Sequence, residues 1–278
     1  MKPSGHGPRP LTALVTGASS GIGEALAGEL ASRGLRLLLT SENAPELERV
    51  RAALAAACPR EVRALALDLT LPDAPERLHE RCRELGWPVD VLVNCAGVFL
   101  NVERELAEPS CSARLLALHV QAPTRLCLLF GRQMLERRRG YILNVASISA
   151  LFPDPSSLTY GPSKRYLLAF SQALALQWRE GGVRVCALVP GGTRTAFFAN
   201  NRVFVPSLVA GHLASPQRVA RAGIEALFRG RRRLIPGLRP RLQVLLFKIL
   251  LASPLFGYTK RLYARLRKNR VAPGSLFP

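Results

Sequence analysis

The sequence predicts an α/β fold, a doubly wound parallel sheet with helices on both faces. From Leu11 onward, short apolar runs alternate with longer amphipathic stretches, an order typical of strand, helix, strand. Most of the short runs are rich in Val, Leu or Ile and are apolar on both alternating faces, as expected for parallel strands covered from both sides. Apolar residues make up 48% of the 278-residue chain, which is enough for a substantial core.

Six of the short runs are expected to be strands. In chain order they are TALVT at Thr12–Thr16, RLLLT at Arg36–Thr40, VRALAL at Val62–Leu67, VDVLVN at Val89–Asn94, GYILNV at Gly140–Val145 and VRVCALV at Val183–Val189. The amphipathic stretches predict helices at Ile22–Arg33, Ala44–Ala57, Pro75–Leu85, Ser112–Arg138 and Ser163–Glu180. No internal repeat or low-complexity linker interrupts the first 225 residues, so they are expected to form one domain.

A glycine-rich turn joins the first predicted strand to the first predicted helix. Its sequence is TGASSGIG, with glycines at 17, 21 and 23. Glycines let the backbone approach a pyrophosphate, while the amides and positive dipole end of the following helix attract its charge. The position of this turn predicts a dinucleotide site, although the same sequence is compatible with a tight turn that binds no ligand.

Polar and small residues end the third and fourth predicted strands. Asp68 is compatible with a helix cap and with an adenine contact. NCAG, from Asn94 to Gly97, carries small residues that permit close approach of a cofactor, and Cys95 is expected to be a small core residue rather than a redox group.

Tyr160 and Lys164 lie four residues apart in YGPSK, and Ser147 precedes them in NVAS. This spacing places Tyr160 and Lys164 on one helix face, where the ammonium favours the phenolate and lowers a phenol pKa that is otherwise about 10. Pro162 requires the helix to begin close to Tyr160. A surface tyrosine beside a solvated lysine is the alternative, and the glycine turn makes it the less favoured one.

Together these segments resemble the short-chain dehydrogenase/reductase family, in its classical subgroup. The resemblance covers about residues 10 to 230 and includes PGGTRT, from Pro190 to Thr195. It implies a Rossmann-like sheet of about seven strands that binds a nicotinamide dinucleotide. Residues 11–230 would then be the dinucleotide-binding and catalytic domain, between a tail of residues 1–10 and a basic extension of residues 231–278.

The resemblance also implies roles for individual residues. Tyr160 is expected to be the general acid/base, Ser147 to hydrogen-bond the substrate oxygen, and Lys164 to hold the nicotinamide ribose. No metal is expected. Contacts to the dinucleotide are expected from Gly17, Ser19, Ser20, Gly21, Ile22, Gly23, Glu42, Asp68, Leu69, Asn94, Ala96, Gly97, Tyr160, Lys164, Pro190, Gly191, Thr193 and Thr195.

His119, in LHVQAP, departs from the family pattern, which has an asparagine there that holds a water between the lysine and solvent. A histidine can also bind water and can itself relay a proton, which predicts a competent enzyme with an altered pH profile. The alternative is a satisfied interior histidine with an impaired or rerouted relay. The chain could then be a dinucleotide-binding scaffold or sensor with weak or lost catalysis.

The choice between NAD(H) and NADP(H) depends on TSEN, which ends the second strand. Related NADP-preferring enzymes have an arginine at about the place of Glu42, and no basic residue replaces Ser19 or Ser20. An acid near the ribose repels a 2′-phosphate and accepts from a 2′-hydroxyl. The sequence therefore favours NAD(H), although Ser41 stands where the NAD-type aspartate usually lies.

Apolar residues gather where the resemblance puts the substrate. They favour an apolar alcohol or ketone, such as a lipid, steroid or acyl compound, while lid packing explains them equally well. The residues are Phe99, Leu100, Leu151, Phe152, Leu158, Phe197 and Phe198. The resemblance also implies a homodimer or homotetramer formed through the central helices.

Much of the net charge of +20 lies near the C-terminus, where residues 226–278 carry 13 Lys and Arg and no acid. Helices are expected at Arg241–Ala252 and Leu255–Lys268. They fit packing on the chain's own domain or a second subunit, and they also fit attachment to an anionic membrane surface. Nucleic-acid binding is disfavoured because the segment has no recognisable module or stacking platform.

The predicted location is cytoplasmic, with membrane association as the other option. The first ten residues lack the apolar core of a secretion signal, and the longest apolar stretch, residues 242–256, is too short to span a bilayer. Six cysteines at wide intervals, without a CxxC pair, fit reduced thiols better than a disulfide or zinc framework.

Overall fold

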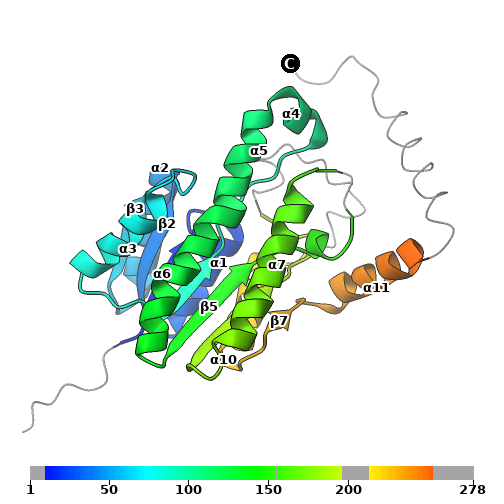
Figure 1. Ribbon diagram of the computed structural model, residues 1–278. Coiled ribbons are helices and arrows are strands. Elements are labelled where there is room, and N and C mark those ends of the chain that lie inside the picture. Colours follow the sequence, from blue (N-terminus) through cyan, green and yellow to red (C-terminus); the bar gives the residue numbers. More distant parts are fainter. Residues whose placement is uncertain (1–9, 154–155, 196–212, 253–278) are drawn as a thin grey trace, which may run out of the picture. The chain divides into compact units, whose positions relative to one another are not determined.

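The computed structural model describes residues 10–153, 156–195 and 213–252. The chain forms two compact units, residues 1–236 and 237–278. In the first unit, a seven-stranded sheet lies between two layers of helices (Figure 1). The α/β class expected from the sequence is confirmed.

The sheet is parallel, with strand order β3–β2–β1–β4–β5–β6–β7. Its strands are β1 Thr12–Thr16, β2 Arg36–Ser41, β3 Val62–Ala66, β4 Val91–Asn94, β5 Gly140–Val145, β6 Val183–Leu188 and β7 Arg233–Leu234. The first six match the expected runs, whereas β7 is a two-residue strand that pairs with the end of β6. β7 belongs to the first unit, which extends to Pro236.

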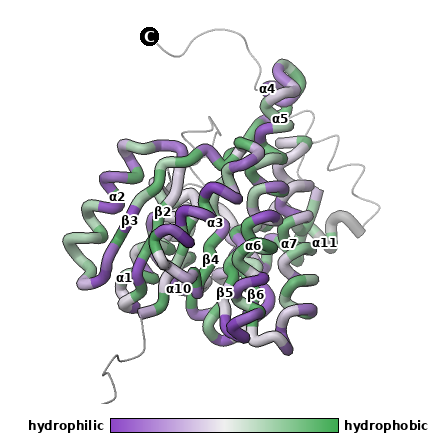
Figure 2. Tube along the Cα trace, turned by 60° about the vertical axis from the view of Figure 1, so that its left-hand side comes forward, coloured by the Kyte–Doolittle hydropathy of each residue, from purple (hydrophilic) through white to green (hydrophobic). Residues whose placement is uncertain are grey.

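Alternate strand residues face opposite helical layers, which explains why the strands are apolar on both faces. Val15 and Val93 belong to one buried cluster, and Leu14 and Leu92 belong to the other. Figure 2 shows β4 and β5 as largely apolar segments. The first cluster includes residues of α1 (Gly21–Ser32), α2 (Ala44–Ala57) and α10 (Pro216–Phe228), and the second includes residues of α3 (Ala74–Glu84), α6 (Ala122–Glu136) and α7 (Tyr160–Gln177).

The helix expected at residues 112–138 is interrupted in the structure. α5 (Pro109–Leu116) leads into the π-helical turn η1 (Ala117–Gln121), and α6 follows. Pro123 explains the interruption, because it has no amide to donate to the carbonyl of His119 and its ring crowds that carbonyl. His119 lies within the π turn and is 1% exposed.

The helix expected from Ser163 begins at Tyr160, as Pro162 requires. Two short helices lie near it in the fold: α4 (Val102–Ala107), which follows β4 along the chain, and the 3₁₀ turn η2 (Ile148–Ala150), which follows β5. Both belong to the segments that connect strand ends to helices. They therefore lie on the side of the sheet where a ligand is expected.

The described part of the second unit is α11 (Leu238–Ala252). Leu238, Leu242, Leu245 and Ile249 recur at helical spacing and are 55% to 73% exposed. No helix within the described ranges is long and apolar enough to cross a membrane. The second C-terminal helix, expected at Leu255–Lys268, lies outside the described residues.

Candidate active site

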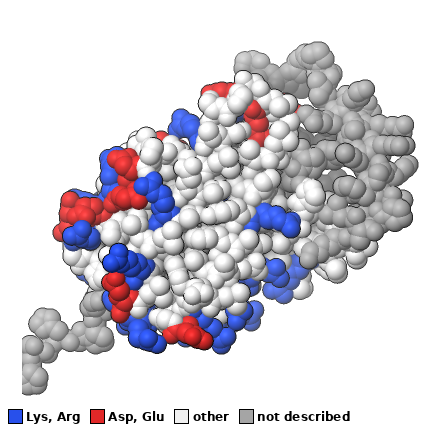
Figure 3. Space-filling model, in the orientation of Figure 1, with Lys and Arg blue, Asp and Glu red and all other residues white. Residues whose placement is uncertain are grey.

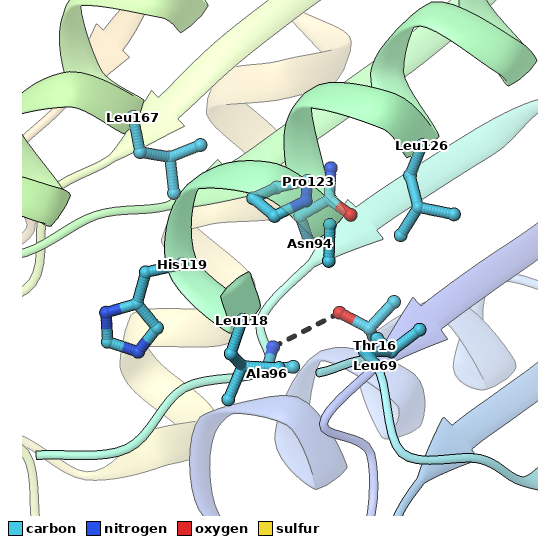
Figure 4. A pocket seen from close by; sticks show the side chains of 10 residues that line it. Thr16, Leu69, Asn94, Ala96, Leu118, His119, Pro123, Leu126 and Leu167 are labelled. Carbon is cyan, nitrogen blue, oxygen red and sulfur yellow. Dashed lines mark hydrogen bonds between the residues drawn. The ribbon is translucent and has the colours of Figure 1, made fainter. Parts of the chain in front are cut away.

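A cleft of about 950 Å³ lies along the carboxyl ends of the strands, where the strand order reverses between β1 and β4. The residues predicted to carry the catalysis or to bind the cofactor line this cleft, except for Asn94 and His119. Those two line a second, much smaller pocket of about 10 Å³ (Figure 4). Among the described residues, no cluster of His, Cys, Asp or Glu could hold a metal ion.

Two glycines of the turn, Gly17 and Gly23, lie so close to neighbouring backbone that neither position has room for a Cβ. Gly17 has φ +64°, and a Cβ there would lie 2.7 Å from Cα of Ala96. A Cβ on Gly23 would lie 2.0 Å from the carbonyl oxygen of Gly17. The Thr16 hydroxyl ties the turn to the end of β4, since it accepts from the amides of Cys95 at 3.0 Å and Ala96 at 3.1 Å (Figure 4). The resulting backbone cradle fits a pyrophosphate.

The PGGTRT segment lies against the same turn. A Cβ on Gly21, which has φ +59°, would meet Cγ2 of Thr195 at 3.0 Å. Thr193 pairs with Ala214 in an isolated parallel bridge, and the Ala214 amide donates to the carbonyl of Gly192 at 3.0 Å. The segment after β6 is thus held at the cleft from both sides.

Ser147, Tyr160 and Lys164 line the same cleft. Ser147 follows β5, and its Oγ accepts from the Ser149 amide at 3.2 Å. Lys164 lies one helical turn after Tyr160 on α7, with Nζ 5.8 Å from the centre of the Tyr160 ring. The structure therefore brings together a hydroxyl, a phenol and an ammonium from two separate elements.

Lys164 is buried although it carries an ammonium group. It is 4% exposed, and its Nζ donates to the carbonyl of Val145 at 3.1 Å. Burial lowers the pKa of Lys164 to about 8, because the charged form loses its water. Gly97 makes room for it, since a Cβ there would lie 3.3 Å from Nζ and 3.0 Å from Nε2 of His119.

Both ring nitrogens of His119 have protein partners. Nε2 accepts from the Val98 amide at 3.0 Å, so the proton of the neutral ring is on Nδ1, which lies 3.0 Å from Oγ of Ser163. Ser163 in turn donates to the carbonyl of Tyr160 at 2.8 Å. Burial, and then the charge of Lys164, hold the pKa of His119 well below its usual 6.5. The ring is therefore neutral at physiological pH.

Asn94 lies beneath the cleft and joins the strands to the helices. Its Nδ2 donates to Oδ1 of Asn144 at 2.8 Å and to Sγ of Cys127 at 3.3 Å. Asn144 continues the network to Ser171 of α7 at 2.8 Å. The signal that singled out Asn94 was its place at a strand end, and its hydrogen-bond partners lie on β5 and α6.

The end of the cleft next to β2 carries several polar groups. Ser41 and Ser19 lie with their Oγ atoms 2.8 Å apart, and Glu42 and Glu46 line the cleft beside them. Sequence reasoning missed Glu46, although its spacing of four residues from Glu42 on the following helix could have indicated it.

Asp68 lines the same cleft at the end of β3. Its Oδ1 accepts from the amide of Thr70 at 2.8 Å, which fixes the turn after the strand. Its Oδ2 lies 3.5 Å from the Arg114 guanidinium of α5. The N-cap residue of α3 is Asp73, so Asp68 does not cap that helix.

Of the apolar residues expected around the substrate, Phe99 lines the cleft, and its ring centre lies 5.2 Å from that of Tyr160. Leu100 is buried, and Leu158 is 54% exposed. Leu151 and Phe152 are half-buried in the segment after β5. Phe197 and Phe198 lie outside the described residues.

A dinucleotide-type glycine turn beside a Ser–Tyr–Lys group defines an α/β protein of the nucleotide-binding class. Residues 11–204 match the model of the short chain dehydrogenase family. The chain therefore belongs to the short chain dehydrogenase family.

Individual relatives agree with this assignment. The human 17-beta-hydroxysteroid dehydrogenase type 3 is 32% identical over 186 residues, which are 66% of this chain and 59% of that protein. The very-long-chain 3-oxoacyl-CoA reductase of Macaca fascicularis is 30% identical over 64% of this chain and 58% of that protein. The matches thus span less than two thirds of these two relatives.

A solved structure is similar over almost the whole chain. The short-chain dehydrogenase from Sphingobium yanoikuyae, in complex with NADPH, has a TM-score of 0.75 and 25% identity, and the match covers 96% of this chain and 98% of that one.

The burial of Lys164 predicts a pH-dependent stability for the dinucleotide-free protein. Below pH 8 the ammonium is charged in the folded and unfolded states, whereas between pH 8 and 10.5 the unfolded state alone holds the proton. Stability should therefore rise with pH through this window, by up to about 3 kcal/mol, relative to Lys164→Met. Urea unfolding at pH 7.5 and pH 10 measures the difference between the two proteins.

The matched control for this experiment is Arg165→Met, which removes an exposed cation next to Lys164. Its free energy of unfolding should change between the two pH values by the same amount as that of the parent. A parent and a Lys164→Met variant with the same pH dependence would contradict the assignment.

Proposed function

We propose that the protein is a nicotinamide-dinucleotide-dependent oxidoreductase that interconverts an apolar secondary alcohol and the corresponding ketone. The observation that carries this proposal is that Ser147, Tyr160 and Lys164 line one cleft with a glycine turn in which Gly17 and Gly23 have no room for a Cβ. The two relatives described above, a hydroxysteroid dehydrogenase and a 3-oxoacyl-CoA reductase, support an apolar substrate class. Phe99 beside Tyr160 supports it as well.

The dinucleotide, when bound, supplies or accepts the hydride. In the direction of reduction, the phenol of Tyr160 donates its proton to the carbonyl oxygen, and in oxidation the phenolate takes it back. Ser147 accepts from the Ser149 amide, which leaves its hydroxyl proton to donate to the same substrate oxygen. Lys164 below pH 8 is a cation that favours the phenolate and binds the ribose hydroxyls.

In this proposal His119 holds α7 in place and does not carry the proton. A relay would need a second proton on the ring, which the Val98 amide prevents by occupying Nε2. The hydrogen bonds to Val98 and Ser163 instead connect the end of β4 to the first turn of α7. An enzyme with a histidine at position 119 can therefore be active.

The first test is the Tyr160→Phe variant, assayed with a ketone panel that contains a 17-ketosteroid, a long-chain 3-oxoacyl thioester and cyclohexanone. We expect kcat to fall by about 10²- to 10⁴-fold, because the proton donor is lost, while the Kd of the dinucleotide changes less than about twofold. Tyr141→Phe, at a tyrosine of β5 that does not line the cleft, is the control and should keep parental activity.

Two results would contradict this proposal. A Tyr160→Phe variant as active as the parent would remove Tyr160 from the chemistry. A parent that binds the dinucleotide but reduces no ketone of the panel would favour the scaffold or sensor function.

We further propose a preference for NAD(H) over NADP(H). Glu42 and Glu46 line the cleft where a 2′-phosphate would lie next to Ser41. Arg49 is close to Ser19, but it is already paired with Glu24 at 3.1 Å and Glu46 at 2.7 Å. A 2′-phosphate would meet the carboxylates of Glu42 and Glu46. It would also compete with Glu24 and Glu46 for Arg49. The S. yanoikuyae structure holds NADPH, so this preference distinguishes the two proteins.

Binding of NADH and NADPH measured side by side tests this preference. We expect NADH to bind at least about fivefold tighter, which corresponds to ~1 kcal/mol of repulsion at an exposed site. Glu42→Arg should reverse the order of the two affinities, so that NADPH binds more tightly than NADH. Glu48→Arg, which lies on the exposed side of α2 and pairs with Arg51, should leave it unchanged. Equal or tighter binding of NADPH to the parent would overturn the preference.

We also propose that the protein is a homodimer or homotetramer formed through α6 and α7. Leu128 of α6 and Tyr166 and Leu176 of α7 are 40% to 61% exposed. In Figure 3 the surface over these two helices is mostly uncharged, while charged residues gather over α2 and α3. An uncharged face with exposed apolar residues is typical of a subunit interface.

For the second unit we propose attachment to an anionic membrane surface. The exposed leucines of α11 lie one helical turn apart, and Arg239 and Arg241 are exposed beside them. The absence of any acidic residue from 226 to 278 supports a negatively charged partner. Apolar side chains and cations on one helix match the interface of an anionic lipid surface.

Vesicle flotation tests this attachment. The parent should float with phosphatidylserine vesicles more than with phosphatidylcholine vesicles, and high salt should weaken the binding. Leu242→Glu combined with Leu245→Glu should reduce the bound fraction by about tenfold or more, because two leucines that enter the lipid contribute a few kcal/mol to the binding free energy. Leu71→Glu, at an exposed leucine of the first unit, is the control. Equal flotation of the double variant and the parent would refute the proposal.

A further inference from the structure

We propose that Glu105 is a positioning residue for Tyr160. It lies on α4 and accepts hydrogen bonds from the two residues that precede α7. The inference rests on the function proposed above, in which Tyr160 exchanges the proton. Sequence reasoning did not single out Glu105.

Glu105 is a buried carboxylate in an otherwise exposed stretch. It is 5% exposed, whereas its neighbours Arg104 and Leu106 are exposed. Its oxygens accept hydrogen bonds from the amide of Leu158 at 2.6 Å, the amide of Thr159 at 2.9 Å and the hydroxyls of Ser157 and Thr159. A buried carboxylate is stable only when it is satisfied in this way, so the site is built around the charge.

Ser157 extends this set of hydrogen bonds to Tyr160. Its Oγ donates to Glu105 at 3.2 Å and accepts from the Tyr160 amide at 3.0 Å. Thr159, the residue that precedes α7, makes no side-chain cap bond to the helix and turns its hydroxyl to Glu105 instead. Glu105 thus holds the residues that lead into α7, including the Ser157 hydroxyl that accepts from the first helical amide. Its negative charge lies next to the positive end of the helix dipole.

Other contacts hold the same region from different directions. The Val102 amide at the start of α4 donates to the carbonyl of Ser156 at 3.2 Å, so α4 meets the segment before α7 at a second point. On the other side, Ser163 donates to the carbonyl of Tyr160 and is held by His119. The backbone of Tyr160 is therefore fixed at its amide through Glu105 and at its carbonyl through His119.

This double attachment matters because proton transfer depends on placement. A displacement of about 1 Å at a reacting group can lower the rate by about 100-fold. Glu105 does not line the cleft, so it acts through the position of Tyr160 and not by touching the substrate or the dinucleotide.

The test compares Glu105→Gln with Glu103→Gln. Glutamine has the size of glutamate, but its NH₂ group would face the amide donors of residues 158 and 159. We expect kcat with the best ketone of the panel to fall by about 10- to 100-fold, while the KM and Kd of the dinucleotide stay within about twofold. Hydrogen exchange at the amides of residues 158–160 should become at least about tenfold faster.

Glu103→Gln removes the same charge from an exposed position of the same helix and should change neither readout. Should Glu105→Gln fail to fold, Ser157→Ala removes the hydroxyl that links Glu105 to the Tyr160 amide and leaves the bonds from the amides of residues 158 and 159 to Glu105 in place. This variant should lower kcat by about fivefold, again without an effect on dinucleotide binding.

The outcomes separate this inference from the proposed function. A Glu105→Gln or Ser157→Ala variant with parental kcat below its melting temperature would overturn the positioning role, even if its Tm has fallen. An inactive Tyr160→Phe variant beside a fully active Glu105→Gln variant would overturn this inference alone. A fully active Tyr160→Phe variant would overturn both.

Discussion

The buried ammonium of Lys164 is the constraint on which the rest of the site depends. A cation in the interior needs an acceptor, which the carbonyl of Val145 provides, and it needs space, which the missing side chain of Gly97 provides. It is also incompatible with a second positive charge beside it. Burial raises the pKa of Cys95 to about 12 and lowers that of His119, so the thiol and the imidazole both carry no charge beside it. The departure from asparagine at position 119 is thus accommodated by keeping the ring neutral and hydrogen-bonded.

The features that the sequence predicted are those with local physical signals. The glycine turn is recognisable because Gly17 and Gly21 adopt positive φ and Gly23 has no space for a Cβ. The six longer strands are recognisable because burial on both faces demands continuous apolar runs. Pro162 indicated where α7 begins, and Tyr160 is indeed the first residue of that helix. In each case one residue and its nearest neighbours carry the information.

The features that were missed depend on contacts between distant residues or on weak local signals. The strand β7 is two residues long and contains an arginine, so no apolar run marks it. The donors to Glu105 lie 52 to 54 residues further along the chain, and no pattern within α4 distinguishes it from Glu103. Pro123 is a local signal for the π turn, but the prediction of one continuous helix at residues 112–138 did not include its effect. The role of His119 depends on its hydrogen bonds to Val98 and Ser163, which are distant in sequence.

The strand order has a consequence for how the chain is synthesised. From β4 to β7, each new strand joins the edge left by the one before it, so the sheet can grow in the order in which the ribosome delivers it. At every stage one growing edge is exposed on this side, and it is filled by the next strand of the same chain. The last strand is two residues long and pairs with the end of β6, so it offers little backbone of its own for pairing with another molecule.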